Sequence, residues 1–453
     1  MKALLSDGEA LPDRGKAPPV AGAIMPRHSS NYLRKYALDR WPLVAGELTG
    51  IDQVVAMPVL AERDRLFSTL AALSRNHEEE IRRTLVICVV NNRGPHLVAS
   101  EIRENNRDTI SGLHALVRGD LPSAEFPADA SLVGNFREIL NNGLRVAYID
   151  ASSPGNEMPD KGGGVGLARK IAMDKSLRVF DYASSAVKLI FCLDADTEVE
   201  NNYLSAVRAF FAWEEMAAAV IAYAHRDIAD SLHTAAIRSY EIFLRYYVLG
   251  LSYAGSPYAF HTVGSTMICT ADAYVAVRGM NTREAAEDFY FLTKLAKVCA
   301  IGTITTTQVH PSARCSNRVP FGTGRQMIRF LEEGKREYML YDPQVFLILK
   351  RWLAAVNSFP DRGGRELQMI ADEIAPGLGA FLRIKRFGEA WDKIRDNCRD
   401  GAVLTHQFSC WFDGFKTLKL IHFLTENAYP RIAMFTAVRQ LLEMMKQEQL
   451  SGQ

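Results

Sequence analysis

Hydrophobic and polar positions along the chain predict buried strands that alternate with helices. Short apolar runs that end in turn residues are typical of strands buried on both faces, and apolar residues spaced three or four apart are typical of helices. The predicted strands are Gln53–Val59, Thr84–Val90, Leu144–Ile149, Val187–Leu193, Ala218–Tyr223, Thr266–Thr270 and Thr303–Val309. The predicted helices are Ser30–Leu48, Arg63–Ser74, Leu167–Val179, His233–Leu251 and Ala286–Val298.

This alternation predicts an α/β fold, in which a doubly wound, mostly parallel sheet has helices on both faces. Beyond about residue 322 the pattern is helical only. We therefore expect a poorly ordered leader at 1–27, an α/β domain at 28–325 and a helical C-terminal region at 326–453. In such sheets the loops after the carboxyl ends of the strands form the binding crevice, so functional residues are sought there.

The composition excludes some classes of function. Lys and Arg number 53 against 52 Asp and Glu, and a formal net charge of +1 gives no support for nucleic-acid binding. The seven cysteines form no CxxC pair, so neither a zinc site nor a disulfide framework is predicted, and a reducing cytosol is the simplest compartment. No signal peptide and no membrane-spanning helix are predicted, while peripheral contact at the inner face of a membrane stays open.

Two carboxylates follow the fourth predicted strand. Phe191, Cys192 and Leu193 are apolar, and Asp194 and Asp196 come directly after them. Alternation along an extended chain turns both Asp side chains to the same side, where they could share one Mg²⁺ or Mn²⁺ ion with a bound diphosphate. The alternative is an acidic turn that ends the strand and caps the next helix.

A second acidic pair lies at the start of the predicted helix at 286–298. Glu287 and Asp288 precede an apolar helical run, and a carboxylate held there can act as a general base toward a hydroxyl. The helix dipole also favours acidic residues at this position. From this pair alone, helix capping is the favoured interpretation.

A basic segment follows the last predicted strand. His310 ends that strand, and Arg314, Arg318 and Arg325 come after it, with two glycines before Arg325. Imidazole is a good ligand for ions such as Mn²⁺, and one guanidinium group can donate to two phosphate oxygens at once. The alternative is a solvated basic loop.

The glycine cluster Gly162–Gly166 opens a predicted helix. It completes neither the dinucleotide fingerprint nor the phosphate-binding loop with its Lys-Ser/Thr pair, so NAD and ATPase functions are weakly indicated. Lys161 and Arg169 flank the cluster, where they could contact a nucleotide donor or face water.

The order of these motifs along the chain is more informative about the protein family than any single motif. The chain runs through Pro58-Val59, Asn91-Asn92, the glycine cluster, Asp194-x-Asp196, Glu287-Asp288 and the His/Arg segment. This order resembles members of glycosyltransferase family 2, which have the GT-A fold. The resemblance covers roughly residues 53–325, is sharpest at 191–196 and 279–288, and leaves out the helical C-terminal region.

The resemblance implies an inverting transferase that moves a sugar from a UDP- or GDP-sugar to a hydroxyl of a glycan, lipid-linked or other acceptor, with Mn²⁺ or Mg²⁺ as cofactor. It implies that the Pro58–Glu62 loop, with Pro58, Val59 and Glu62, contacts the nucleotide. It implies that Asp194 contacts the ribose or the metal, and that Asp196 and His310 are metal ligands. By the same resemblance Asp288, beside Glu287, is the catalytic base, and Arg318 and Arg325 contact the donor phosphates.

The sequence departs from the family at one point and leaves several alternatives open. Asn91 and Asn92 stand where the family usually has acidic residues that hold the nucleobase, although an amide can also bond a base edge. A sugar-nucleotide pyrophosphorylase and a non-catalytic nucleotide-sugar binding protein are the rival functions. The aromatic stretch Tyr240–Phe260 could stack on sugar rings or a lipid tail, although its spacing favours core packing. For the C-terminal helices, an acceptor lid, a homodimer surface and a membrane-facing platform all remain open.

Overall fold

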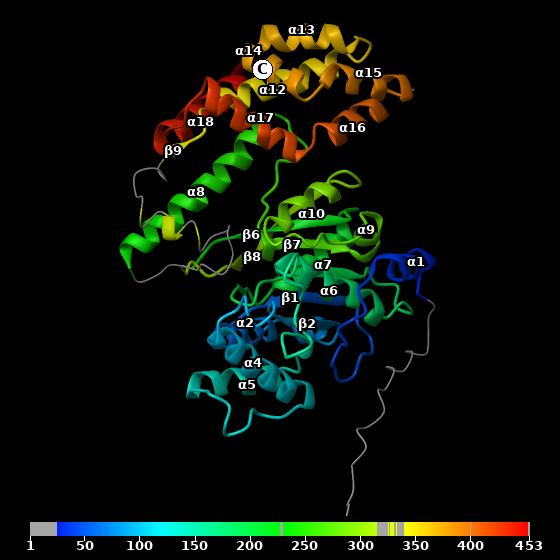
Figure 1. Cartoon of the computed structure of the whole chain (residues 1–453), viewed down its shortest axis with the longest axis vertical. Helices are drawn as coiled ribbons and strands as arrows, with labels where there is room; N and C mark the ends of the chain where they lie inside the picture. The colour runs from blue at the N-terminus through cyan, green and yellow to red at the C-terminus, as the bar shows by residue number, and fades with distance from the viewer. Residues whose placement is uncertain are drawn as a thin grey trace, which may run out of the picture.

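The computed structural model describes residues 25–226, 230–314, 325, 327–329, 332, 339–398 and 400–451. Its centre is an eight-stranded sheet in the order β3-β2-β1-β4-β7-β6-β8-β5 (Figure 1). The strands are β1 (Gln53–Val59), β2 (Thr84–Asn91), β3 (Arg145–Ala151), β4 (Leu189–Cys192), β5 (Glu198–Val199), β6 (Ala218–Tyr223), β7 (Met267–Thr270) and β8 (Ile301–His310).

The sheet is mostly parallel, which confirms the predicted α/β class. Strand β1 pairs in parallel with β2 and β4, β2 with β3, and β6 with β8. Strand β7 is antiparallel to β4 and β6, and β5 is antiparallel to β8. The chain builds outward from β1 to β3 and then returns to place β4 on the other side of β1. This reversal makes the carboxyl ends of β1 and β4 the topological switch point, where such sheets bind ligands.

Helices cover both faces of the sheet. One core holds residues of α1 (Arg27–Tyr36), α6 (Val165–Val179), α9 (Ala271–Ala276) and α10 (Glu287–Leu295). The opposite core holds residues of α2 (Arg63–Ser74), α4 (Ser100–Arg118), α5 (Ala130–Asn141) and α7 (Tyr203–Trp213), near the short α3 (Glu78–Ile81). Strand β1 is apolar after Gln53 because both of its faces are buried: Val54 and Ala56 enter the first core, and Val55 and Met57 enter the second.

The first predicted helix is wrong in extent. The pattern predicted Ser30–Leu48, but α1 starts at Arg27 and ends at Tyr36. Pro42 cannot continue a helix, and the residue before it is biased toward extended conformations. That residue, Trp41, is buried, and its indole N–H donates a 2.6 Å hydrogen bond to the carbonyl of Asn156.

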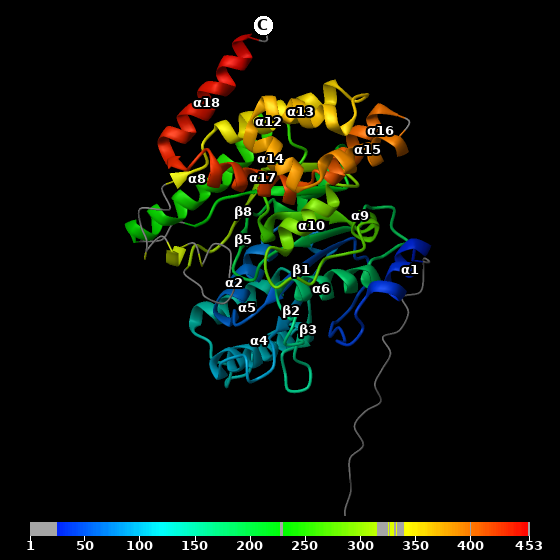
Figure 2. The same cartoon turned by 45° about the horizontal axis from the view of Figure 1, so that its top comes forward.

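A third core gathers the C-terminal helices above the sheet (Figures 1 and 2). It includes residues of α8 (Ser231–Tyr253), so this long helix links the sheet with the helical region. The other helices are α12 (Gln344–Ser358), α13 (Gly364–Ile374), α14 (Pro376–Ile384), α15 (Phe387–Asn397), α16 (Gly401–Trp411), α17 (Gly414–Asn427) and α18 (Met434–Ser451).

Two short strands correct the prediction that this region is helical only. Strands β9 (Met339–Leu340) and β10 (Ile432–Ala433) form an antiparallel pair. Segments of two residues are too short to show any periodicity, so the sequence pattern does not reveal them.

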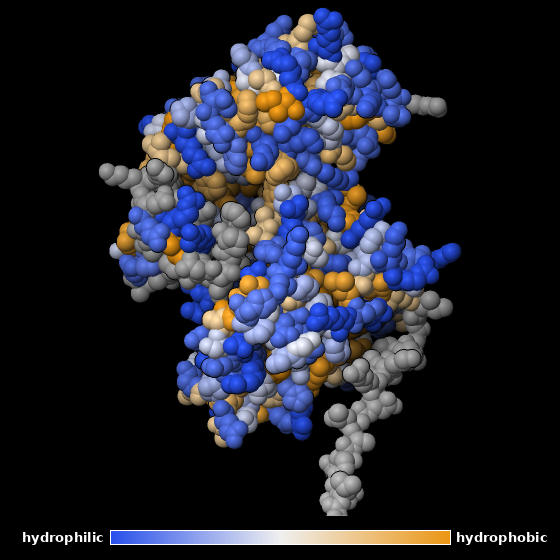
Figure 3. Space-filling model, in the orientation of Figure 1, coloured by the Kyte–Doolittle hydropathy of each residue, from blue (hydrophilic) through white to orange (hydrophobic). Residues whose placement is uncertain are grey.

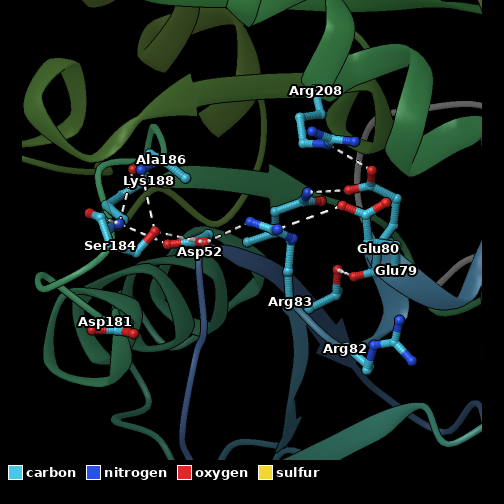
Figure 4. A network of polar contacts seen from close by, with 12 residues as sticks. Asp52, Glu79, Glu80, Arg82, Arg83, Asp181, Ser184, Ala186, Lys188 and Arg208 are labelled. Atoms are coloured by element: carbon cyan, nitrogen blue, oxygen red, sulfur yellow. Dashed lines mark hydrogen bonds and ion pairs between the residues drawn. The ribbon is translucent and has the colours of Figure 1, made fainter.

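An ionic network closes the amino-terminal edge of the sheet, opposite the switch point (Figure 4). Asp52 lies just before β1 and accepts a 2.6 Å hydrogen bond from Nζ of Lys188, which lies just before β4. Glu80 lies near the start of β2 and accepts hydrogen bonds from Nε2 of Gln53 (2.8 Å) and Nε of Arg208 (2.5 Å). Asp52 and Glu80 are buried and saturated with partners, so this edge has a structural role and the opposite edge is left for ligands.

Within the described part of the chain, none of the helices combines the length and apolar character needed to cross a bilayer. The face in Figure 3 is mostly hydrophilic, with hydrophobic residues in scattered patches. Cys88, Cys192 and Cys269 are free and buried.

Candidate active site

Asp194 and Asp196 emerge at the switch point, directly beyond β4. Leu193 and Ala195 alternate with them and are buried in the core. The two Asp side chains are 36% and 21% exposed, so both lie where a ligand can reach them. Beyond the end of β4, at Cys192, buried and partly exposed residues alternate from 193 to 196, and both carboxylates are on the open side.

Arg169 ties Asp194 to the acidic pair of α10. Its buried guanidinium donates to Oδ1 of Asp194 (2.6 Å), Oε1 of Glu287 (3.1 Å) and the carbonyl of Gly264 (3.0 Å). Burial alone would lower the pKa of Arg169, but the charges of Asp194 and Glu287 outweigh it and hold the pKa above its ordinary value. Gly264 has to be glycine here, since a Cβ atom would lie 2.4 Å from Nη2 of Arg169.

Arg314 forms a second bridge, between the loops after β1 and β4. Its Nη2 lies 3.0 Å from Oδ2 of Asp196 and is also bonded to Oε1 of Glu62. Burial and the charge of Asp196 raise the pKa of Glu62 to about 8, against the lowering effect of Arg314. Burial likewise raises the pKa of Asp196, although Arg314 opposes the shift. The sequence placed Arg314 in the basic segment without a partner, and the structure supplies two, Glu62 and Asp196.

The two residues of the α10 pair differ in environment. Glu287 is buried and held by Arg169, and the side chain of Asn281 donates to its carbonyl oxygen (2.8 Å). Asp288 accepts a 2.7 Å hydrogen bond from the N–H of Phe289, and within the described residues it forms no ion pair. Burial, followed by the charge of Glu287, raises the pKa of Asp288 to about 7. This is the range in which a carboxylate works well as a general base near neutral pH.

The glycine cluster packs two loops together. A Cβ atom at Gly166 would lie 2.4 Å from the carbonyl oxygen of Arg283, and one at Gly163 would lie 2.0 Å from that of Pro159. The N–H groups of Gly166 and Gly162 donate to the carbonyl of Arg283 (3.2 Å) and to Oε1 of Glu284 (2.9 Å). The cluster therefore docks the start of α6, which carries Arg169, against the loop that leads to Glu287.

Asn106 is a buried organising residue that the sequence pattern did not indicate. Its Oδ1 accepts from the N–H of Ala61 (2.9 Å), and its Nδ2 donates to the carbonyl of Asn91 (3.1 Å) and to Oδ1 of Asn92 (2.8 Å). Ala61 has a left-handed backbone (φ 53°), which is unfavourable without such support. Asn106 thus holds the loop that presents Glu62. The sequence offered no signal for it, because helix α4, which carries Asn106, was itself not predicted.

Three further candidates lie in or beside β1 and β2, and a fourth lies before the glycine cluster. Asn91 is buried, and with its amide oriented to satisfy hydrogen bonding it donates to the carbonyls of Val59 (3.1 Å) and Val89 (3.3 Å). Pro58 is half-buried and Val59 lies in the core. Lys161 is exposed.

The basic segment is only partly described. His310 contacts the carbonyl oxygen of Ala224 (Nδ1, 3.2 Å) and Oε1 of Glu200 (Nε2, 3.7 Å). Arg318 lies outside the described residues, and Arg325 is exposed. Within the described ranges no three His, Cys, Asp or Glu side chains are grouped so that they could hold a metal ion by themselves.

Comparison with known proteins finds distant structural neighbours. No protein-family model matches the sequence, and neither does any curated protein. Among solved structures, a segment of S. aureus TarS is 13% identical with a TM-score of 0.35, over 79% of this chain and 91% of that one. The same TarS segment in complex with UDP-GlcNAc gives 14% identity and a TM-score of 0.36 over the same shares. The mannosyltransferase PcManGT from Pyrobaculum calidifontis, in complex with GDP-Man and Mn²⁺, gives 14% and 0.34 over 85% and 92%. Likeness at this level assigns neither substrate nor mechanism to this chain.

Proposed function

We propose that the chain is a metal-dependent, inverting glycosyltransferase that moves a sugar from a nucleotide-diphosphate donor to a hydroxyl of its acceptor. One observation carries the proposal. At the switch point of the sheet, five carboxylates meet two guanidinium groups among the described residues. The carboxylates are Glu62, Asp194, Asp196, Glu287 and Asp288, and the guanidinium groups are those of Arg169 and Arg314.

The excess of negative charge fits a divalent cation. The pKa values of Glu62, Asp196 and Asp288 are all raised, and a neighbouring carboxylate contributes to each shift. Mg²⁺ and Mn²⁺ are commonly bound by one or two carboxylates, with substrate phosphates as further ligands. In this proposal Asp194 and Asp196 hold the ion, whose charge would offset that of the departing diphosphate.

The acidic residues of α10 then have separate tasks. Asp288 takes the proton from the acceptor hydroxyl as the hydroxyl oxygen bonds to the anomeric carbon. The bond between that carbon and the diphosphate breaks in the same displacement, the nucleoside diphosphate leaves with the electron pair, and the configuration inverts. Glu287 is held by Arg169 and fixes the start of α10, so Asp288 is the base and Glu287 positions it.

A panel of UDP- and GDP-sugars tests the function directly. We expect metal-dependent release of the nucleoside diphosphate, with the sugar transferred to an acceptor or to water. Formation of a nucleoside triphosphate and a sugar 1-phosphate when pyrophosphate is added would indicate a pyrophosphorylase, because that reaction breaks the bond between the two phosphates of the donor. Tight binding of donors without any turnover, across a broad range of acceptors, would indicate a binding protein. Either outcome would contradict the proposal.

The dependence of transfer on pH should follow Asp288. A general base must be ionised, and a pKa raised to about 7 keeps the inactive protonated form present up to neutral pH. We therefore expect kcat/KM for transfer to fall as the pH drops below about 7, approaching tenfold per unit. The residual activity of the Asp288→Asn variant should not show this fall in kcat/KM at low pH. A wild-type profile that is flat down to about pH 5 would contradict the assignment.

Asp196→Asn should uncouple donor binding from the metal. The amide keeps the size of the side chain but removes the charge that would hold the ion. We therefore expect the factor by which Mn²⁺ increases donor affinity to be at least about tenfold smaller in the variant than in the wild type. Titration calorimetry of UDP and GDP, with and without Mn²⁺, measures this difference. Asp272→Asn on α9 is the matched control, since its carboxylate is 79% exposed and contacts His28. An unchanged metal effect in Asp196→Asn would refute this role.

A further inference from the structure

A groove lies on the surface of the C-terminal region, between α14 and α17. The two helices pack against each other (Figure 2), and the groove along them has a volume of about 190 Å³. An apolar cavity of about 150 Å³ can hold a benzene ring, so the groove has room for one ring or a short alkyl chain. None of the residues that line it belongs to the proposed active site.

The floor of the groove is apolar. The rings of Phe381 on α14 and Phe423 on α17 both line it, and their centroids are 5.8 Å apart. Ile384, the last residue of α14, also lines the groove and is 62% exposed. A large aliphatic side chain that stays open to water beside two aromatic rings forms an apolar surface that a bound ligand would cover.

The charged residues of the groove are separated along its length. Lys419 and Glu426 are seven residues apart on α17, which is about two helical turns or roughly 10 Å. Burial lowers the pKa of Lys416 in the first turn of α17, and the charge of Lys385 adds to this shift, so Lys385 lies near that turn. The charge of Glu426 acts instead on the pKa of His422, one turn before it. The groove therefore has a cationic end, with Lys385 and Lys419, and an acidic end at Glu426.

The cationic end has no carboxylate partner among the residues that the structure describes. Lys385 and Lys419 form no ion pair there, and their Nζ atoms lie over the rings of Phe381 (5.4 Å to the centroid) and Phe415 (5.3 Å). Burial lowers the pKa of His422, so its imidazole is neutral near pH 7 and does not neutralise an anion. An anionic group at this end would be attracted by two ammonium groups, and the apolar floor begins directly beside them.

We propose that this groove binds an amphiphile, with its phosphate or carboxylate group at the cationic end. The alkyl chain or ring of the ligand lies on Phe381, Phe423 and Ile384. Such a ligand comes either from a membrane surface, as an anionic lipid, or from solution, and the experiment distinguishes these two sources. The inference goes beyond sugar transfer and does not depend on it.

Three small molecules test the groove in the full chain. The probes are n-hexyl phosphate, n-hexanol and inorganic phosphate, each titrated calorimetrically. We expect n-hexyl phosphate to bind at least about tenfold more tightly than either of the other two, because it alone combines the charge with apolar surface to be buried. Equal affinity for n-hexyl phosphate and one of the simpler probes would overturn the proposal.

Surface substitutions locate this binding on the molecule. The double variant Lys385→Gln with Lys419→Gln removes the cationic end and should weaken binding of n-hexyl phosphate at least about tenfold. Ile384→Ser removes apolar surface, so it should weaken that binding at least about threefold and leave the affinity for inorganic phosphate unchanged.

The matched controls are Lys393→Gln on α15 and Met369→Ser on α13. Both side chains are exposed and neither lines the groove, so binding should stay at the wild-type level. Thermal unfolding followed by circular dichroism shows that each variant is folded. An affinity for n-hexyl phosphate that survives both the double lysine variant and Ile384→Ser would refute the assignment of the site.

Sedimentation with lipid vesicles identifies the source of the ligand. Binding to phosphatidylglycerol vesicles but not to phosphatidylcholine vesicles, lost in the double lysine variant, indicates a membrane lipid. Binding of n-hexyl phosphate without sedimentation indicates a soluble amphiphile, whereas equal sedimentation with both kinds of vesicle contradicts recognition of an anion. Absence of turnover in the donor panel would leave this site standing, and failure of the n-hexyl phosphate test would leave the proposed transferase function standing.

Discussion

Replacement of Asp288 by asparagine is expected to reduce sugar transfer by about 10²–10⁴-fold, the usual contribution of a general base. The amide retains the size of the side chain and can still accept the hydrogen bond from the N–H of Phe289, so the start of α10 should keep its geometry. Donor binding should remain near the wild-type level, because the contacts of Arg169 and Arg314 do not involve this side chain. Initial rates and calorimetric donor affinity, measured on the same preparation, separate the two effects.

The control for this variant is Asp120→Asn. Asp120 is exposed and pairs with Arg118 at the end of α4, so its replacement should leave transfer and donor binding unchanged. Transfer by Asp288→Asn within about threefold of the wild-type rate would remove Asp288 from the mechanism. Loss of donor binding and transfer together would instead indicate a collapsed site and would contradict the separate tasks of Glu287 and Asp288.

Replacement of Arg169 by methionine should have the largest effect on stability. The buried guanidinium holds Asp194, Glu287 and the carbonyl of Gly264, and its loss leaves the buried carboxylate of Glu287 without this donor. Removal of one partner from a buried ionic group usually costs about 3–5 kcal/mol of unfolding free energy. Donor binding should be lost as well, since Asp194 is no longer oriented. Urea unfolding curves measure the first effect and titration with nucleotide the second.

Arg178→Met is a matched control on the same helix. Arg178 pairs with Asp39 at the surface and is 43% exposed, so the cost should be at most about 1 kcal/mol. Arg169→Lys should recover only part of the loss, because a single ammonium nitrogen cannot reproduce the planar fork of guanidinium donors. If Arg169→Met unfolded within about 1 kcal/mol of the wild type, the ionic network around Arg169 would not be the element that stabilises the site.

Several elements could be predicted from local sequence. Strand β1 and helix α2 have the predicted bounds, Gln53–Val59 and Arg63–Ser74. Both are governed by backbone geometry over a few residues, with a period of two for strands and 3.6 for helices. The pattern missed α4 and α7. Only a few residues of α4 are buried, among them polar Asn106 and Thr109, so its apolar stripe is weak.

The candidate site, like the fold, could be predicted only in part from the sequence. Asp194 and Asp196 could be located because Leu193 and Ala195 alternate with them in a buried strand end. The partners of these carboxylates could not be found this way. Arg169 is 118 residues from Glu287, and Arg314 is 252 residues from Glu62.

By itself, the sequence determined the type of the main elements, the edge of the sheet where carboxylates gather and the side to which they point. These properties depend on interactions between near neighbours along the chain. Only the tertiary structure decided which arginine neutralises which carboxylate, and that the glycine cluster docks a loop. Such contacts depend on the path of the chain between distant segments, and no local periodicity encodes that path.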